Sequence, residues 1–225
     1  MKYFIVLLFS VAALADDPQI SVQGNCEIKV TPDRGAITFT AENQARDQKD
    51  AVKRTTEQVN QLKEEIKKLK LADLELKNTN YNVFPVREYE KEKIVDKGIR
   101  ATLSLEVTTS EIARIGEAMQ AAAKVGVINV GSLATFLSLE KSQKEYLKCL
   151  DVAADDARGK AQQLAKKLGF KIGDVINLNE VPQIPRPVPI IMERAMMKSM
   201  DAAPTQVEPG TQQYSTNIQV TFKIK

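Results

Sequence analysis

Residues 142–169 read SQKEYLKCLDVAADDARGKAQQLAKKLG, and this stretch carries the signals for both ends of a helix. Ser142 and Glu145 have the spacing of a capping box, and Gly169 stands where a left-handed residue commonly ends a helix. Apolar residues recur between them at spacings of three and four, so they share one helical face. They are Tyr146, Leu150, Ala153, Ala154, Ala157, Ala161, Leu164, Ala165 and Leu168. Because most of these side chains are small, we expect the helix to lie closely on a β-sheet.

Strand patterns occupy much of the remaining chain. Apolar and polar residues alternate with period two, which predicts strands at residues 20–30, 36–41, 74–86, 98–109, 127–139, 171–181 and 215–224. Pro32 and Asp33 indicate a turn, so we expect the first two strands to pair as a hairpin. The charged residues 87–97 predict an exposed hairpin connection or a projecting loop.

Two more helices are expected before residue 142. Residues 47–70 carry a narrow apolar stripe, which indicates a surface helix packed on the sheet; a coiled-coil seam is the alternative, for which the stripe is barely long enough. A short helix should begin at the cap Ser110 and end at Gly126. The chain therefore predicts an α+β fold, with a mixed, largely antiparallel β-sheet and two long helices and one short helix packed against it. One continuous sheet or two lobes fit equally well.

The amino terminus has the features of an export signal. Lys2 precedes an apolar run, and Ala13-Leu14-Ala15 matches the A-x-A cleavage pattern. We expect residues 1–15 to be a removed signal peptide, residues 16–225 to be the mature domain, and the protein to be exported. No later stretch approaches the roughly 20 apolar residues of a membrane span, so no transmembrane segment is expected after removal of the signal.

Composition argues against several classes of function. The 225 residues include 32 basic and 29 acidic ones, and this near balance argues against nucleic-acid binding. The chain has no histidine, which removes the commonest general base and metal ligand at neutral pH. Asp155, Asp156 and Arg158 diverge around the expected helix and predict a solvated face. We expect no catalytic, cofactor-binding or metal-binding residues.

A long segment, residues 182–214, interrupts the strand pattern before the last strand. It concentrates proline and methionine, and proline lacks the backbone donor that a sheet needs. We expect a loop excursion whose apolar residues form an adaptable contact surface for a partner or a neighbouring subunit. These residues are Ile190, Ile191, Met192, Met196, Met197 and Met200.

The two cysteines, Cys26 and Cys149, leave two readings open. Cys26 lies on the apolar face of the first strand, and Cys149 lies at the flank of the apolar stripe of the long helix. If that helix covers that strand, they form a disulfide, which an exported protein permits. Otherwise they are two buried, inert thiols. Neither has the C-x-x-C spacing or a histidine neighbour that would lower the pKa of a reactive thiol.

Several short strings, taken in order, resemble the SIMPL-domain family, which includes YggE-like envelope proteins described as oxidative stress defence proteins. The strings are Ile20-Ser21-Val22-Gln23-Gly24, Pro32-Asp33, Gly98-Ile99-Arg100-Ala101, Asp156-Ala157-Arg158, Lys160-Ala161, Leu164-Ala165, Gly169, Gly173 and Glu208-Pro209-Gly210. The resemblance implies an α+β domain in the periplasm without known catalytic residues, and ring-like or channel-like oligomers in some members. It also implies a loosely defined role in envelope or oxidative stress.

These observations give two functional hypotheses. The first is a non-enzymatic periplasmic protein that acts through self-assembly, as a homo-oligomer, or through binding a protein partner, with the segment after residue 181 as the contact element. The second is a thiol-based redox protein of the envelope that uses Cys26 and Cys149.

Overall fold

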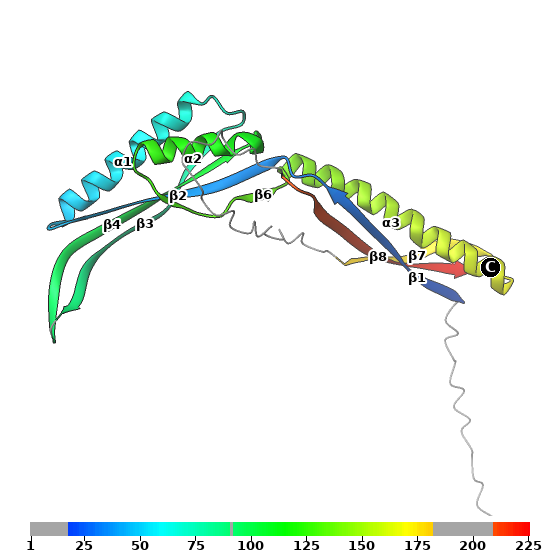
Figure 1. Ribbon diagram of the computed structural model, residues 1–225. Helices are drawn as coiled ribbons and strands as arrows, with labels where there is room; N and C mark the ends of the chain where they lie inside the picture. The colour runs from blue at the N-terminus through cyan, green and yellow to red at the C-terminus, as the bar shows by residue number, and fades with distance from the viewer. Residues whose placement is uncertain (1–17, 91, 182–208) are drawn as a thin grey trace, which may run out of the picture. The chain divides into compact units, whose positions relative to one another are not determined.

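The computed structural model describes residues 18–90, 92–181 and 209–225, which divide into two compact units (Figure 1). Unit 1 contains residues 18–27, 146–181 and 215–225, and unit 2 contains residues 28–90, 92–145 and 209–214. Each unit is built on its own antiparallel sheet. The α+β class predicted from the sequence is therefore confirmed, and of the two arrangements left open the chain adopts the one with two sheets.

Unit 1 is a small sheet covered by one helix. Strand β8 (Gln212–Ile224) lies between β1 (Gln19–Val30) and β7 (Ile172–Val181), and helix α3 (Leu139–Leu168) runs along the sheet (Figure 1). The helix buries one small residue per turn against the strands. These residues are Cys149, Ala153, Ala157, Ala161 and Ala165.

The helix approaches β1 as closely as the alanine stripe predicts. A Cβ placed on Gly24 of β1 would lie 2.0 Å from the carbonyl oxygen of Ala153. The buried stripe is narrower than expected, because Ala154, Leu164 and Leu168 are exposed. The buried residues are spaced four apart, so each turn of α3 places only one side chain against the small sheet.

The start of α3 differs from the predicted capping box. The helix begins at Leu139, so Ser142 and Glu145 lie inside its first turns. Ser138 occupies the capping position instead, because its Oγ accepts a hydrogen bond from the Lys141 N–H at 3.3 Å. The predicted end is confirmed, since Gly169 follows the helix with φ of +79°.

Unit 2 packs two helices on a five-stranded sheet. Helix α1 (Gln48–Lys68) begins at the cap Asp47, whose side chain accepts from the Asp50 N–H, and α2 (Ile115–Lys124) follows a short 3₁₀ turn (Ile112–Arg114). The strand order is β3-β4-β2-β5, with β6 also paired to β2. These strands are β2 (Arg34–Ala45), β3 (Glu75–Glu90), β4 (Lys93–Thr109), β5 (Asn129–Val130) and β6 (Ala134–Phe136).

The core of unit 2 lies between the sheet and the helices. Apolar side chains of β2 and β4 alternate toward α1 and α2, whose apolar faces meet them. The surface-helix interpretation of residues 47–70 is therefore confirmed. The largest fully buried members of this core are Phe39, Val59, Leu62, Ile66, Leu105, Val107, Ile115 and Val127.

Three local predictions for these elements were wrong. Strands β1 and β2 do not pair as a hairpin, because they belong to different sheets. Residues 127–139 do not form one strand but contain the two short strands β5 and β6. Ser110 does not cap a helix; its hydroxyl donates to the Ala72 carbonyl at 3.4 Å, and no side chain caps the 3₁₀ turn or α2. A short turn sequence is compatible with several paths of the chain that follows it, and the tertiary packing determines which path forms.

Candidate functional site

A disulfide joins Cys26 of β1 to Cys149 of α3 within unit 1. Their Cα atoms are 5.5 Å apart, and the two residues are 3% and 0% exposed. The bond therefore ties α3 to β1 beside the close approach of Gly24 to Ala153. Thiol–disulfide exchange requires a thiolate to reach one of the sulfurs, and this burial closes that route while unit 1 is folded.

Polar contacts reinforce the same junction beside the disulfide. The Asp156 carboxylate accepts from the Asn25 backbone N–H at 2.8 Å and from Lys160 Nζ at 2.6 Å. Lys160 also donates to the Gln23 carbonyl at 2.9 Å. The hydrogen bonds from Lys160 and Asn25 lower the pKa of Asp156 below its usual value. Asp156 thus fastens α3 to β1 and does not merely face solvent, as the sequence had suggested.

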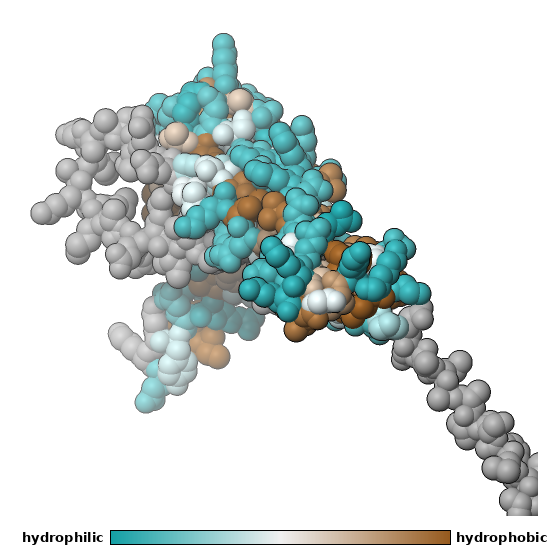
Figure 2. All heavy atoms as spheres, turned by 90° about the vertical axis from the view of Figure 1, so that its right-hand side faces the viewer, coloured by the Kyte–Doolittle hydropathy of each residue, from teal (hydrophilic) through white to brown (hydrophobic). Residues whose placement is uncertain are grey.

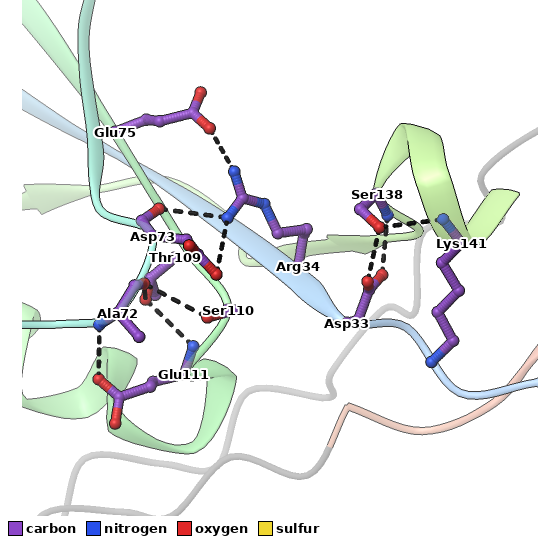
Figure 3. Close-up of polar contacts among 10 residues, drawn as sticks. All are labelled: Asp33, Arg34, Ala72, Asp73, Glu75, Thr109, Ser110, Glu111, Ser138 and Lys141. Carbon is purple, nitrogen blue, oxygen red and sulfur yellow. Dashed lines mark hydrogen bonds and ion pairs between the residues drawn. The ribbon is translucent and has the colours of Figure 1, made fainter.

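A cluster of polar contacts surrounds the start of β2 in unit 2 (Figure 3). Arg34 donates to the Asp73 carbonyl at 3.2 Å and forms ion pairs with the Asp73 and Glu75 carboxylates. Glu111 accepts from the Ala72 N–H at 2.8 Å, which lowers the pKa of Glu111. These contacts hold the connection between α1 and β3 against the start of β2 and against the segment that follows β4.

Asp33 forms the second half of this cluster (Figure 3). Its two oxygens accept from the backbone N–H and the hydroxyl of Ser138, at 2.8 and 2.7 Å. Partial burial alone would raise the pKa of Asp33, but the hydrogen bonds to its carboxylate, chiefly those from Ser138, and the charge of Lys141 together bring the pKa below its usual value. Lys141 donates to the Thr31 carbonyl at 2.8 Å. The turn residues Pro32 and Asp33 therefore anchor the start of α3 and do not make a hairpin.

Neither junction has the arrangement of an active centre. Asp33, Glu111 and Asp156 accept hydrogen bonds that lower their pKa values, whereas a general base works best with a pKa near the working pH. Among the residues that the structure describes, no group of three or more Asp, Glu or Cys side chains is placed to hold a metal ion. Both junctions fit the role of fixing neighbouring elements in place.

Strand β7 presents an apolar surface at the edge of the sheet of unit 1. Val175, Ile176 and Leu178 are 47%, 50% and 58% exposed, and Figure 2 shows hydrophobic atoms among hydrophilic ones on the face that includes this unit. Val175 and Leu178 pair with the buried residues Phe222 and Val220, so they extend the apolar face that packs under α3. Within the described sheet β8 is the partner of β7, and the other side of β7 is unpaired.

The sequence-predicted contact residues are not part of this surface. Ile190, Ile191, Met192, Met196, Met197 and Met200 lie outside the described residues. Strand β7 ends directly before that segment and was predicted only as a strand. Its signal in the sequence is the adjacent pair Val175 and Ile176, because two neighbouring apolar residues point to opposite faces and a one-sided strand buries only one of them.

The described helices also bear on membrane insertion. In residues 18–90, 92–181 and 209–225, none of the helices has both the length and the apolar character needed to cross a lipid bilayer.

Known proteins resemble this chain over nearly all of its length. A sequence profile of the SIMPL family, described as a protein of unknown function (DUF541), matches residues 20–222. The "Uncharacterized protein YggE" of Escherichia coli (strain K12) is 26% identical over 216 residues, which cover 94% of this chain and 85% of that protein. The "26 kDa periplasmic immunogenic protein" of Brucella melitensis biotype 1 is 26% identical over 237 residues, covering 98% and 93%. A protein of the same name from Brucella abortus (strain S19) is also 26% identical over 237 residues.

Proposed function

Because the chain belongs to the SIMPL family, we propose that it is a non-enzymatic periplasmic protein that acts through self-assembly, with the exposed edge of β7 as a contact surface. The periplasmic location is supported by the signal-like residues 1–15 and by the name of the Brucella relatives. A setting in envelope or oxidative stress defence is proposed on the family resemblance alone.

The observation that carries this proposal is the composition of the β7 edge. An unpaired edge strand offers backbone N–H and C=O groups to any other strand, and proteins usually protect such edges with charge, proline or a cover. β7 carries the charged residues Asp174 and Glu180 toward its ends, but between them it presents Val175, Ile176 and Leu178 about half exposed. An apolar strand edge of this kind is stable in solution when a partner covers it, which favours a contact surface.

The test compares two leucines of unit 1 that are equally exposed. Leu178 of β7 is 58% exposed and Leu147 of α3 is 59% exposed. We expect purified residues 16–225 to form a discrete oligomer in light scattering after size exclusion, Leu178→Asp to lower its mass by removing the β7 contact, and Leu147→Asp to leave its mass unchanged. A monomeric wild type across a wide concentration range, or an unchanged mass for Leu178→Asp, would contradict the proposal.

The alternative role as a thiol-based redox protein rests on the pairing of Cys26 with Cys149. The burial of both residues argues against it, because redox partners need access to a sulfur. Thiol titration of the native protein under mild reductant separates the two roles. Rapid release of two thiols without unfolding would favour the redox role.

A further inference from the structure

A two-stranded ribbon extends from the sheet of unit 2. Strand β2 pairs with β4 only as far as Ala45 with Ile99, whereas β3 and β4 continue to pair until Glu90 with Lys93. Figure 1 shows this hairpin curving away beyond the end of β2. We call residues 87–90 and 93–96 the distal ribbon. Within the described sheet, its two strands have only each other as partners.

The direction of the distal ribbon is built into the chain at its base. The register between β3 and β4 shifts between Pro85 and Arg87, where β4 has one extra residue, and such a bulge bends a strand and strengthens its twist. Gly98 lies beside this bulge with φ of +95°, and a Cβ there would be 2.2 Å from the Ala45 carbonyl oxygen. A positive-φ glycine and a bulge at one level fix where the ribbon leaves the sheet.

One face of the ribbon combines apolar side chains with both signs of charge. Tyr89 pairs across the strands with Ile94, and Arg87 pairs with Asp96. Residues two apart in a strand share a face, so these four side chains lie together and we call them the tyrosine face. Tyr89 and Ile94 are 73% and 71% exposed. Large apolar side chains this exposed, on a ribbon of fixed direction, indicate a contact surface.

We infer that the tyrosine face docks on the tyrosine face of a second copy of this chain, an inference that rests on the proposed self-assembly and adds a second contact to it. A twofold axis parallel to the ribbon exchanges the two strands of facing copies. It places Tyr89 against Ile94 of the second copy and Arg87 against Asp96 of the second copy. The face therefore places apolar against apolar side chains and each charge against its opposite when it meets a second copy, as a twofold contact requires.

The balanced charge of the ribbon favours a second copy of this chain over a membrane surface or a nucleic acid as its partner. Residues 87–97, which comprise the ribbon, its turn and Lys97, contain four basic and four acidic residues, so this segment has no net charge. An anionic membrane surface or a nucleic acid gains no attraction from a balanced ribbon, whereas an identical face supplies each charge with its opposite.

The test exchanges the charges in full-length mature chains that also carry Leu178→Asp, so that the β7 contact does not obscure the result. We expect Arg87→Asp and Asp96→Arg each to weaken self-association in sedimentation velocity by about tenfold, because each faces like charges in its own dimer. Mixing the two variants should restore association, since both contacts in the mixed dimer are again opposite. Glu88→Lys on the other face of the ribbon is the matched control and should associate like its parent.

A second pair of variants covers the case in which Asp96→Arg disturbs the ribbon, because Asp96 also accepts from the Gly98 N–H at 2.8 Å. Tyr89→Glu and Ile94→Lys leave that bond intact and should likewise associate only when mixed. A contrary result is self-association that returns in the double variant Arg87→Asp/Asp96→Arg but not when the two single variants are mixed. That result would show that Arg87 and Asp96 pair within one ribbon, and it would overturn the inference. Failure of both mixed pairs would also overturn it. Leu178→Asp alone reports on the β7 contact, so the two proposals fail separately.

Discussion

Replacing Gly24 by alanine should destabilise unit 1 strongly, although it adds only one methyl group. Gly24 lies in β1 beneath α3, and the added Cβ would be 2.0 Å from the Ala153 carbonyl oxygen and 2.9 Å from the Ala157 Cβ. The nearer atom belongs to the backbone of a helix, so no rotamer change removes the clash. Relief requires the helix and the strand to separate by about an ångström or more, the distance by which the contact falls short of ordinary packing.

The disulfide increases the expected loss of stability, because it restricts the movement that would relieve the clash. Cys26 lies two residues beyond Gly24 and Cys149 lies one helical turn before Ala153, with their Cα atoms 5.5 Å apart. The helix is therefore held to the strand close to the point where it would need to move away. Overpacking a core costs about 1–3 kcal/mol, and we expect a loss near 3 kcal/mol because the usual relaxation is blocked.

The assay is urea unfolding followed by circular dichroism, with the disulfide intact. Gly159→Ala in the middle of α3 is the matched control, because a Cβ there meets nothing within 4 Å. Alanine is favoured over glycine inside a helix, so the control should gain about 0.5–1 kcal/mol. Glycine to alanine in the same unit should thus lower the free energy of unfolding at Gly24 and raise it at Gly159.

A Gly24→Ala variant within about 0.5 kcal/mol of wild type, the range of neutral surface changes, would refute the close packing of α3 on β1. A second-site change Ala157→Gly should not rescue the variant, because the shorter contact is with the Ala153 backbone. Rescue by that change would place the clash at the side chain instead.

Two further predictions concern the same unit. Cys26→Ala with Cys149→Ala should lower the free energy of unfolding by about 5 kcal/mol, the loop-entropy value for a sequence separation of 123, and an unchanged urea midpoint would contradict it. Because Asp156 has a lowered pKa, its ionised form stabilises the fold above the ordinary value of 3.8, and this contribution is lost as pH falls through the lower value in the folded state. Asp156→Asn should therefore flatten the dependence of stability on pH between about pH 5 and pH 2, and an unchanged slope in acid titrations of the urea midpoint would argue against the contact.

Much of the fold was predictable because its signals are local. The alanine stripe of residues 153–165 indicated a close helix–sheet contact, and the alternation of residues 98–109 indicated a buried strand, later seen as part of β4. The pairing of β1 and β2 was not predictable, because a turn such as Pro32-Asp33 looks alike whether its flanking strands pair or enter separate sheets. The β7 edge was recognised as a strand but not as a surface, since exposure depends on which strands lie beside it.

The distal ribbon illustrates a second limit. Its charged residues indicated an exposed hairpin, but the shared face of Arg87, Tyr89, Ile94 and Asp96 depends on a bulge that shifts the register by one residue. A shift of one residue moves every side chain to the opposite face, and no local pattern in residues 85–98 indicates where the bulge occurs.

The bond between Cys26 and Cys149 also makes the chain between them a closed covalent ring. Residues 28–145, the continuous part of unit 2, lie wholly inside that ring, while unit 1 is completed only when residues 215–225 join it. The part of unit 2 formed by residues 28–145 is thus an insertion that can fold before residues 215–225 are available, whereas unit 1 must wait for the carboxyl terminus. A single protease cut inside residues 28–145 would leave the two fragments linked until the disulfide is reduced.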